Sequence, residues 1–185
     1  MKRLIRNIMV VAVMLGTSTG YANQTLKETP TFKYINEGHM LTVINASGDI
    51  IYSGRIKQSG SLDRLFDFSQ LKDGNYTVEI SKDFEIEVID LEVKDNNVKL
   101  FTETEEKVFK PVFRTENSML IVSKIALDTK EMDVELYFED ELIHKETVKG
   151  DDILNRVYRL DRTLNGNYTA VIRCNGRVYI KDFRI

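Results

Sequence analysis

The imidazole and thiol groups of this chain are confined to three residues, His39, His144 and Cys174. Neither histidine stands in the acid–histidine–nucleophile order of a catalytic triad. A structural zinc ion needs four nitrogen or sulfur ligands, one more than these residues supply. We therefore predict that the chain has no catalytic residue and no zinc site.

Calcium binding through side-chain oxygen atoms is a second candidate function. Asp151-Asp152, or Asp73 with Asn75, could provide these oxygens. Both places lack the closely alternating acids of a calcium-binding loop, so we interpret them as turns. The glycine patterns that bind nucleotide phosphates do not occur. The sequence thus predicts no metal and no cofactor.

Cys174 has no partner for an intramolecular disulfide, because it is the chain's single cysteine. One interpretation is a reactive thiol or an intermolecular bridge. The other, which we favour, is a small buried side chain at the end of a strand.

A five-residue turn organises the rest of the sequence. Asp73–Thr77 (DGNYT) recurs ninety-two positions later as Asn165–Thr169 (NGNYT). When 62–93 is laid over 154–185 without gaps, eight of 32 positions are identical. Alternating patterns alone could arise in any two β-sandwiches, but the shared turn favours common ancestry. The structural residues that we single out are the matched pairs Gly74/Gly166, Tyr76/Tyr168 and Asp90/Asp182.

The residues around this turn predict its geometry. Leu71–Tyr76 resembles the tyrosine corner of immunoglobulin-like sandwiches, in which the tyrosine hydroxyl bonds back to the preceding backbone. Gly74 is expected to supply a positive φ. The apolar phase changes from even to odd positions beside Asp90 and beside Asp182, which predicts a β-bulge at each. We expect Val178, Ile180, Phe183 and Ile185 to be buried.

Two-residue alternation dominates the chain and predicts strands rather than helices. Leu62, Phe66 and Phe68 are included in this alternation. The acidic stretch 103–106 is taken as a boundary. The predicted fold class is all-β, with two tandem immunoglobulin-like β-sandwich modules at 23–103 and 104–185.

The first 22 residues have the order of a secretory signal peptide: the basic residues Lys2, Arg3 and Arg6, an apolar run over 8–15, then small residues before Ala22. The apolar run is too short to span a membrane, so no membrane span is expected after cleavage. Removing this segment leaves 23 basic and 29 acidic residues, a net charge of −6. An acidic chain of this kind argues against a nucleic-acid partner. We predict an exported protein, located in the periplasm, at the cell surface or outside the cell.

Several segments resemble the C-terminal sorting domains of the bacterial type IX secretion pathway. They are 41–45 (LTVIN), 48–52 (GDIIY), 66–71 (FDFSQL) and 73–80 (DGNYTVEI), with a similar second copy over 158–169. The resemblance implies a small β-sandwich with a final strand at the chain end. It also implies a role as a secretion signal for the second module.

These observations leave three hypotheses on function. The first is a non-catalytic interaction or structural module of the bacterial envelope that contacts a protein or glycan through its surfaces and edge strands. The second is that the C-terminal module acts as a sorting domain. The third is a small hydrolase or ligand-binding enzyme in a groove between the modules, which would place His39 or His144 beside a carboxylate and a hydroxyl. We expect no such constellation.

Overall fold

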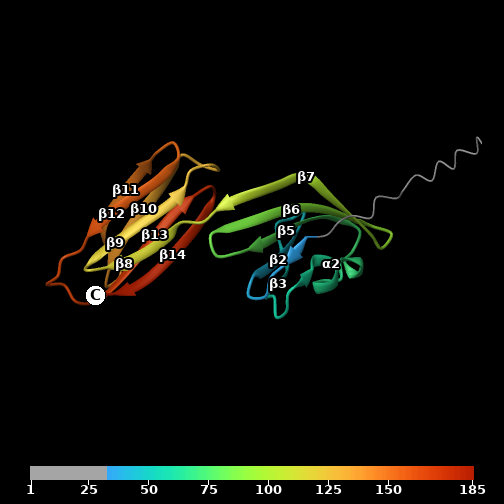
Figure 1. Ribbon diagram of the computed structural model, residues 1–185, viewed down its shortest axis with the longest axis horizontal. Helices are drawn as coiled ribbons and strands as arrows, with labels where there is room; N and C mark the ends of the chain where they lie inside the picture. Colours follow the sequence, from blue (N-terminus) through green and yellow to red (C-terminus); the bar gives the residue numbers. More distant parts are fainter. Residues whose placement is uncertain (1–32) are drawn as a thin grey trace, which may run out of the picture. The chain divides into compact units, whose positions relative to one another are not determined.

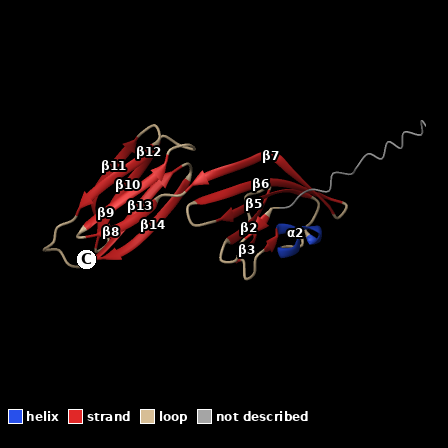
Figure 2. Cartoon of the chain, in the orientation of Figure 1, coloured by secondary structure: helices blue, strands red, loops and turns tan. Residues whose placement is uncertain are grey.

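The computed structural model describes residues 33–185, so the predicted signal peptide lies outside the described residues. Within this range the regular secondary structure is almost entirely strand, as predicted (Figure 2). The helical residues of the described range are the α-helix α2 (Leu62–Leu65) and the 3-10 helix η1 (Phe68–Gln70). The all-β fold class predicted from the alternation is therefore confirmed.

The N-terminal part of the chain, which comprises β1 to β7, contains a five-stranded antiparallel sheet in the order β3-β2-β5-β6-β7 (Figure 1). Its strands are β2 (Met40–Asn45), β3 (Ile50–Arg55), β5 (Gly74–Ser81), β6 (Glu85–Lys94) and β7 (Asn97–Phe109). One face of this sheet packs against a thin layer made of the short strand pair β1 (Tyr34–Ile35) and β4 (Gly60–Ser61), with α2 and η1. The N-terminal core lies between these layers; its fully buried residues include Ile35, Leu41, Val43, Leu62, Val78, Ile80 and Leu91.

The segment around Leu62 and Phe68 differs from the prediction, because it forms α2 and η1 instead of a strand. Asp67 caps η1, since its carboxylate accepts a hydrogen bond from the backbone N–H of Ser69 (3.1 Å) and another from the Ser69 hydroxyl (2.6 Å). Such side-chain bonds to the local backbone favour helix starts and turns over strands. Leu62 and Phe68 are nevertheless buried, so their contribution to the core was predicted correctly.

The C-terminal part of the chain, which comprises β8 to β14, is a sandwich of two antiparallel sheets, in the orders β11-β10-β13-β14 and β12-β9-β8 (Figure 1). The first sheet contains β10 (Glu131–Phe138), β11 (Glu141–Lys149), β13 (Asn167–Cys174) and β14 (Arg177–Arg184). The second contains β8 (Val112–Glu116), β9 (Met119–Ile125) and β12 (Ile153–Arg159). The C-terminal core fills the space between them and includes Leu120, Val122, Met132, Val134, Leu154, Ala170 and Ile172.

The two parts share a strand order. The order β3-β2-β5-β6 corresponds to β11-β10-β13-β14, and the pair β1-β4 corresponds to β9-β12. The boundary predicted at 103–106 falls inside β7 rather than in a linker. Four residues of β7, 102–105, lie opposite Ile89 of β6 alone, between the pairs Val88–Glu106 and Asp90–Phe101. The acidic stretch is therefore an irregular part of an edge strand.

The apolar phase change in β6 and β14 has a different cause from the predicted bulges. β14 pairs with β13 in unbroken register from Arg177 to Arg184, so the bulge predicted beside Asp182 is wrong. β6 also pairs with β5 without a shift, and the irregularity beside Asp90 arises on β7. The even-numbered apolar residues lie on the outer face of each sheet. Val178 and Ile180 are 51% and 63% exposed, whereas Phe183 and Ile185 are half-buried, so the predicted burial of the first two is wrong.

Candidate functional site

The repeated turn forms a tyrosine corner in both parts of the chain. The Tyr76 hydroxyl donates to the carbonyl oxygen of Lys72 (2.9 Å), and the Tyr168 hydroxyl donates to that of Leu164 (3.0 Å). Both tyrosines are almost fully buried, 9% and 2% exposed, so each hydroxyl needs such a partner. These are the bonds that the sequence predicted, and they give the two tyrosines a structural role.

The two glycines of the turn differ in their surroundings. Gly74 has the predicted positive φ, +156°, which lies close to extended backbone. At Gly166 an added Cβ would lie 2.5 Å from a carboxylate oxygen of Glu139 and 2.7 Å from the ring of Phe138. The same carboxylate accepts a hydrogen bond from the backbone N–H of Asn167 (2.8 Å). Gly166 is therefore fixed by close packing of the turn against the end of β10.

Asp90 and Asp182 occupy equivalent places on the outer faces of their sheets. Asp90 accepts a hydrogen bond from the Thr77 hydroxyl (2.7 Å), and Asp182 accepts one from Thr169 (2.8 Å). In each case the threonine directly follows the corner tyrosine and lies opposite the aspartate in the neighbouring strand. The matched aspartates thus make a cross-strand pair, which is the function of the position that we had assigned to a bulge.

The C-terminal corner bond can be tested by one substitution. Tyr168→Phe removes only the hydroxyl and with it the hydrogen bond to the Leu164 carbonyl oxygen, so the free energy of unfolding should fall by about 1 kcal/mol. Chemical denaturation followed by circular dichroism measures this change. Tyr34→Phe is the matched control, because Tyr34 is 71% exposed and should be insensitive to the loss of its hydroxyl. Equal stability of the two variants would contradict a stabilising role for the corner.

His144 lies in a polar cluster at the open side of the C-terminal sandwich, where β11 and β12 meet. The Glu146 carboxylate is 3.6 Å from His144 Nε2, accepts from the Tyr158 hydroxyl (2.8 Å) and accepts from Arg156 Nε (3.2 Å). The rings of His144 and Tyr158 are 5.4 Å apart. A histidine therefore lies beside a carboxylate and a hydroxyl, but the side chains all come from β11 and β12 of one sandwich. The constellation that we expected to be absent was one in a groove between the modules.

The electrostatics of this cluster favour a clamp over a catalytic site. Burial would raise the pKa of Glu146, but hydrogen bonds from Tyr158 and Arg156 outweigh it and hold the pKa below its ordinary value. Burial and the bond to Glu146 raise the pKa of Tyr158 far above its ordinary value, so this hydroxyl stays protonated. A nucleophile needs the opposite shift. The cluster therefore ties β11 to β12 through the Glu146 carboxylate, whose charged form these hydrogen bonds favour.

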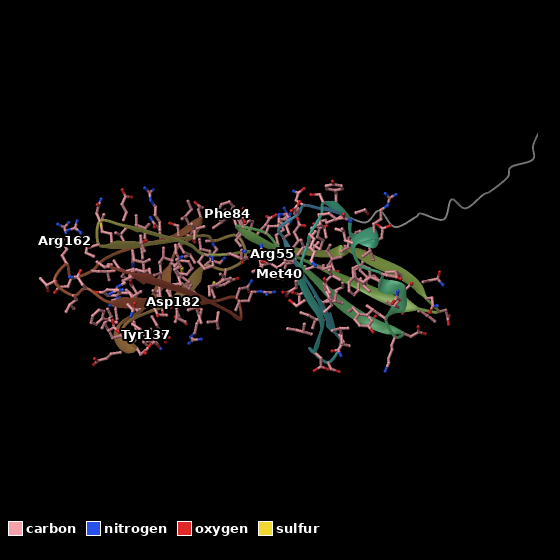
Figure 3. The ribbon with its side chains drawn as sticks, turned by 90° about the horizontal axis from the view of Figure 1, so that it is seen from below. Met40, Arg55, Phe84, Tyr137, Arg162 and Asp182 are labelled. Carbon is pink, nitrogen blue, oxygen red and sulfur yellow. The ribbon has the colours of Figure 1, made fainter. Side chains whose placement is uncertain are left out.

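His39 lines an open hollow of about 530 Å³ together with Ser81, Asp83 and Lys110. Met40 and Arg55, which lie side by side in the pairing of β2 with β3, complete one wall (Figure 3). This hollow also contains a histidine, a hydroxyl and a carboxylate. However, Ser81 Oγ accepts from Lys110 Nζ (3.2 Å), and His39 Nδ1 is buried without a hydrogen-bond partner. The base–nucleophile contact that a hydrolase requires is not formed at Nδ1.

Cys174 is a buried free thiol at the end of β13, as we favoured. Burial raises the pKa of this thiol above its ordinary value, which opposes thiolate chemistry. Within residues 33–185 no group of three or more His, Cys, Asp or Glu side chains is arranged to hold a metal ion. The same residues contain no helix of the length and hydropathy needed to cross a membrane.

An apolar surface on the three-stranded sheet was missed by the sequence analysis. Residues that alternate with the buried ones point outward and pair across strands, Ile153 with Ile125 and Val157 with Ile121. We call this surface the outer apolar face; it consists of Val112, Met119, Ile121, Ile125, Ile153 and Val157. Ile153, Val157, Ile125 and Val112 are 62%, 50%, 45% and 42% exposed. The sequence feature that could have predicted this face is the occurrence of consecutive apolar residues, such as Ile121-Val122 and Ile153-Leu154. Because side chains alternate along a strand, such pairs give it two apolar faces.

The outer face of the other sheet of the C-terminal sandwich is polar by comparison. Glu135 accepts hydrogen bonds there from Lys145 (3.0 Å) and Tyr137 (3.1 Å). Tyr137 and Asp182, both labelled in Figure 3, lie on the same row of this face through Thr169. Exposed apolar side chains gathered on one surface mark interaction sites, so the outer apolar face, although the Ser123–Asn155 row crosses it, is the better candidate for an interaction site.

Comparisons with known proteins provide no family assignment. No family model matches the chain, and no curated protein matches it. Among solved structures it is similar to the BSP domain of a biofilm-associated protein, with 16% identity, 81% of this chain and 25% of that chain covered, and a TM-score of 0.30. It is also similar to extracellular domains 3–5 of Drosophila OTK, with 9% identity, 80% and 86% coverage, and a TM-score of 0.25. The chain thus spans a quarter of the length of the first, and neither similarity indicates a function.

Proposed function

We propose that this chain is an exported, non-catalytic β-sandwich protein that binds a protein partner of the bacterial envelope through the outer apolar face. The observation that carries the proposal is the exposure of paired apolar side chains across β12, β9 and β8. Export is supported by the basic, apolar and small-residue order of 1–22.

The chemistry of the face favours a protein over a glycan. Contact between aliphatic side chains and other aliphatic or aromatic side chains removes apolar surface from water. Each Å² removed stabilises the contact by about 25 cal/mol. The Ser123–Asn155 hydrogen bond (3.0 Å) lies within the face, between the Ile153–Ile125 and Val157–Ile121 pairs. The Arg114–Glu116 ion pair (2.6 Å) borders the face on β8, so polar groups accompany the apolar ones as they do in protein interfaces. The absence of an activated nucleophile at His39, His144 and Cys174 supports a non-catalytic role within residues 33–185.

Two tandem copies of one module are part of the proposal. Their common strand order, the two tyrosine corners and the two Thr–Asp pairs support descent from one ancestral sandwich. The type IX sorting role remains an alternative for the C-terminal part, and it predicts that this part directs export instead of binding.

The proposal is tested by adding charge to the face. A partner recovered from envelope extract and then purified should bind Val157→Lys at least about tenfold more weakly than the unmodified chain, which corresponds to about 1.4 kcal/mol. Desolvating a new ammonium group at the centre of an apolar contact is the physical reason. Titration calorimetry measures the affinity.

Leu142→Lys is the matched control, because Leu142 is 49% exposed and lies on β11 of the other sheet. It should bind the purified partner as the unmodified chain does. Equal affinity of the Val157→Lys variant would rule out this face, and a partner that is glycan would exclude the proposed chemistry.

A further inference from the structure

β14 ends the sheet order β11-β10-β13-β14, so within residues 33–185 one side of its backbone has no partner strand (Figure 1). Among the edge strands, β11, β3 and β7 pair with register shifts, whereas β14 pairs in unbroken register over its eight residues. It is longer than the other regular edges, β12 and β8. Long regular edges without bulges or proline are the ones that accept another strand.

The hydrogen bonds next to β14 define which backbone groups are free. Gly166 and Ile185 exchange both bonds, N to O 3.1 Å and 3.3 Å. Bonded pairs alternate along an antiparallel ladder, so the odd-numbered residues of β14 bond to β13. The N–H and C=O groups of Val178, Ile180 and Asp182 therefore point to the open edge.

Two of the three residues with free backbone groups, Val178 and Ile180, have apolar side chains. Val178 and Ile180 are 51% and 63% exposed on the outer face of the sheet. Ile180 lies opposite Val171 of β13, which is 8% exposed, so the apolar row ends abruptly at the edge. A strand added beyond β14 would continue that row.

Charge selects the register in which a second β14 can be added. With a two-fold axis at Ile180, Ile180 faces its own copy, Val178 faces Asp182 and Tyr179 faces Lys181. Shifting the axis to Lys181 opposes two lysines, and shifting it to Tyr179 opposes Arg177 with Lys181; like charges directly opposite destabilise a sheet. All three registers pair even-numbered residues with each other and so use the free backbone groups; the Ile180 register forms about six such hydrogen bonds without opposing like charges.

We propose that two copies of this chain associate through antiparallel pairing of their β14 strands about a two-fold axis at Ile180. The result is a continuous eight-stranded sheet, in which Ile180 of each copy contacts its counterpart and Val178 lies beside Asp182 of the other copy. Because the contact uses the same residues on both sides, it closes as a dimer and does not propagate. This surface is separate from the outer apolar face, which remains open in the dimer.

A cysteine scan in the purified chain tests both the contact and its register. The background is Cys174→Ala, which removes the native thiol. In the pairing proposed, the Cα atoms at position 180 of the two copies lie about 5.5 Å apart, within the range of a disulfide. Ile180→Cys should therefore form an interchain disulfide under mild oxidation. Val178→Cys should not, because its two copies lie about 13 Å apart, four residues along the ladder.

Sedimentation measures the same contact without a crosslink. The unmodified chain should be a dimer, and Ile180→Lys should raise the dimer dissociation constant at least about tenfold by opposing two lysine side chains. Ile143→Lys on β11, where Ile143 is 48% exposed, should have no effect. A chain that is monomeric at high concentration, or a dimer in which position 180 does not crosslink, would overturn the proposal.

Discussion

Lys124→Met is expected to lower the free energy of unfolding of the C-terminal part by about 3–5 kcal/mol, because it breaks a buried ion pair. The side chains of Lys124 and Asp128 are 0% and 4% exposed, and the Lys124 ammonium donates to Asp128 Oδ1 and to the carbonyl oxygen of Ile125 (3.1 Å). Without the ammonium group, the Asp128 carboxylate keeps neutral donors at Phe109 N (3.1 Å) and Asn175 Nδ2 (3.4 Å). These are too weak to compensate a buried charge.

Denaturation followed by far-ultraviolet circular dichroism suits this test, since the chain has no tryptophan. The double variant Lys124→Met/Asp128→Asn should recover most of the loss, because it leaves no unpaired charge. Lys130→Met is the exposed control: its pair with Asp151 is on the surface and should leave the midpoint nearly unchanged. A loss that is the same in the single and the double variant would show that the charge is not the cause.

The position of Lys124 illustrates what alternation predicts and what it leaves open. Leu120, Val122 and Lys124 share one phase of β9, so the pattern places the lysine on the inner face. It does not indicate the partner, because Asp128 lies beyond the strand and reaches Lys124 through the turn after β9. The same limit applies to His144 and Glu146, whose contact with Tyr158 depends on how two sheets meet.

The two faces of β14 show a second limit. The alternation of side chains along the strand places Val178 and Ile180 on one face and Tyr179 and Phe183 on the other. It does not indicate which of the two faces is buried. We assigned burial to Val178, Ile180, Phe183 and Ile185, which mixes residues of both faces, whereas Tyr179 and Phe183 are the residues that pack against the C-terminal core. By contrast, the tyrosine corners were predictable, because a glycine-containing turn followed by tyrosine has a local geometry that needs no knowledge of distant strands.

Truncation after Asn175 is expected to unfold the C-terminal part while the N-terminal core stays folded. β14 contributes Tyr179 and Phe183 to the C-terminal core, and the Phe183 ring stacks on Tyr168 at 5.5 Å. Burying two such side chains contributes about 3–6 kcal/mol, comparable to the net stability of a small domain. Removing β14 also leaves β13, a central strand, without the partner that spans its whole length. No residue of β14 belongs to the N-terminal core.

Hydrogen exchange measured by peptide resolves the two cores. Amides of β9, β10 and β13 should lose their protection in the truncated chain, and amides of β2, β5 and β6 should keep theirs. The matched control is the full-length variant Val178→Thr/Ile180→Thr, which changes only exposed side chains of the same strand and should remain protected throughout. A truncated chain that stays protected in both cores and merely remains inside the cell would favour the sorting role, because β14 would then be needed for export and dispensable for folding.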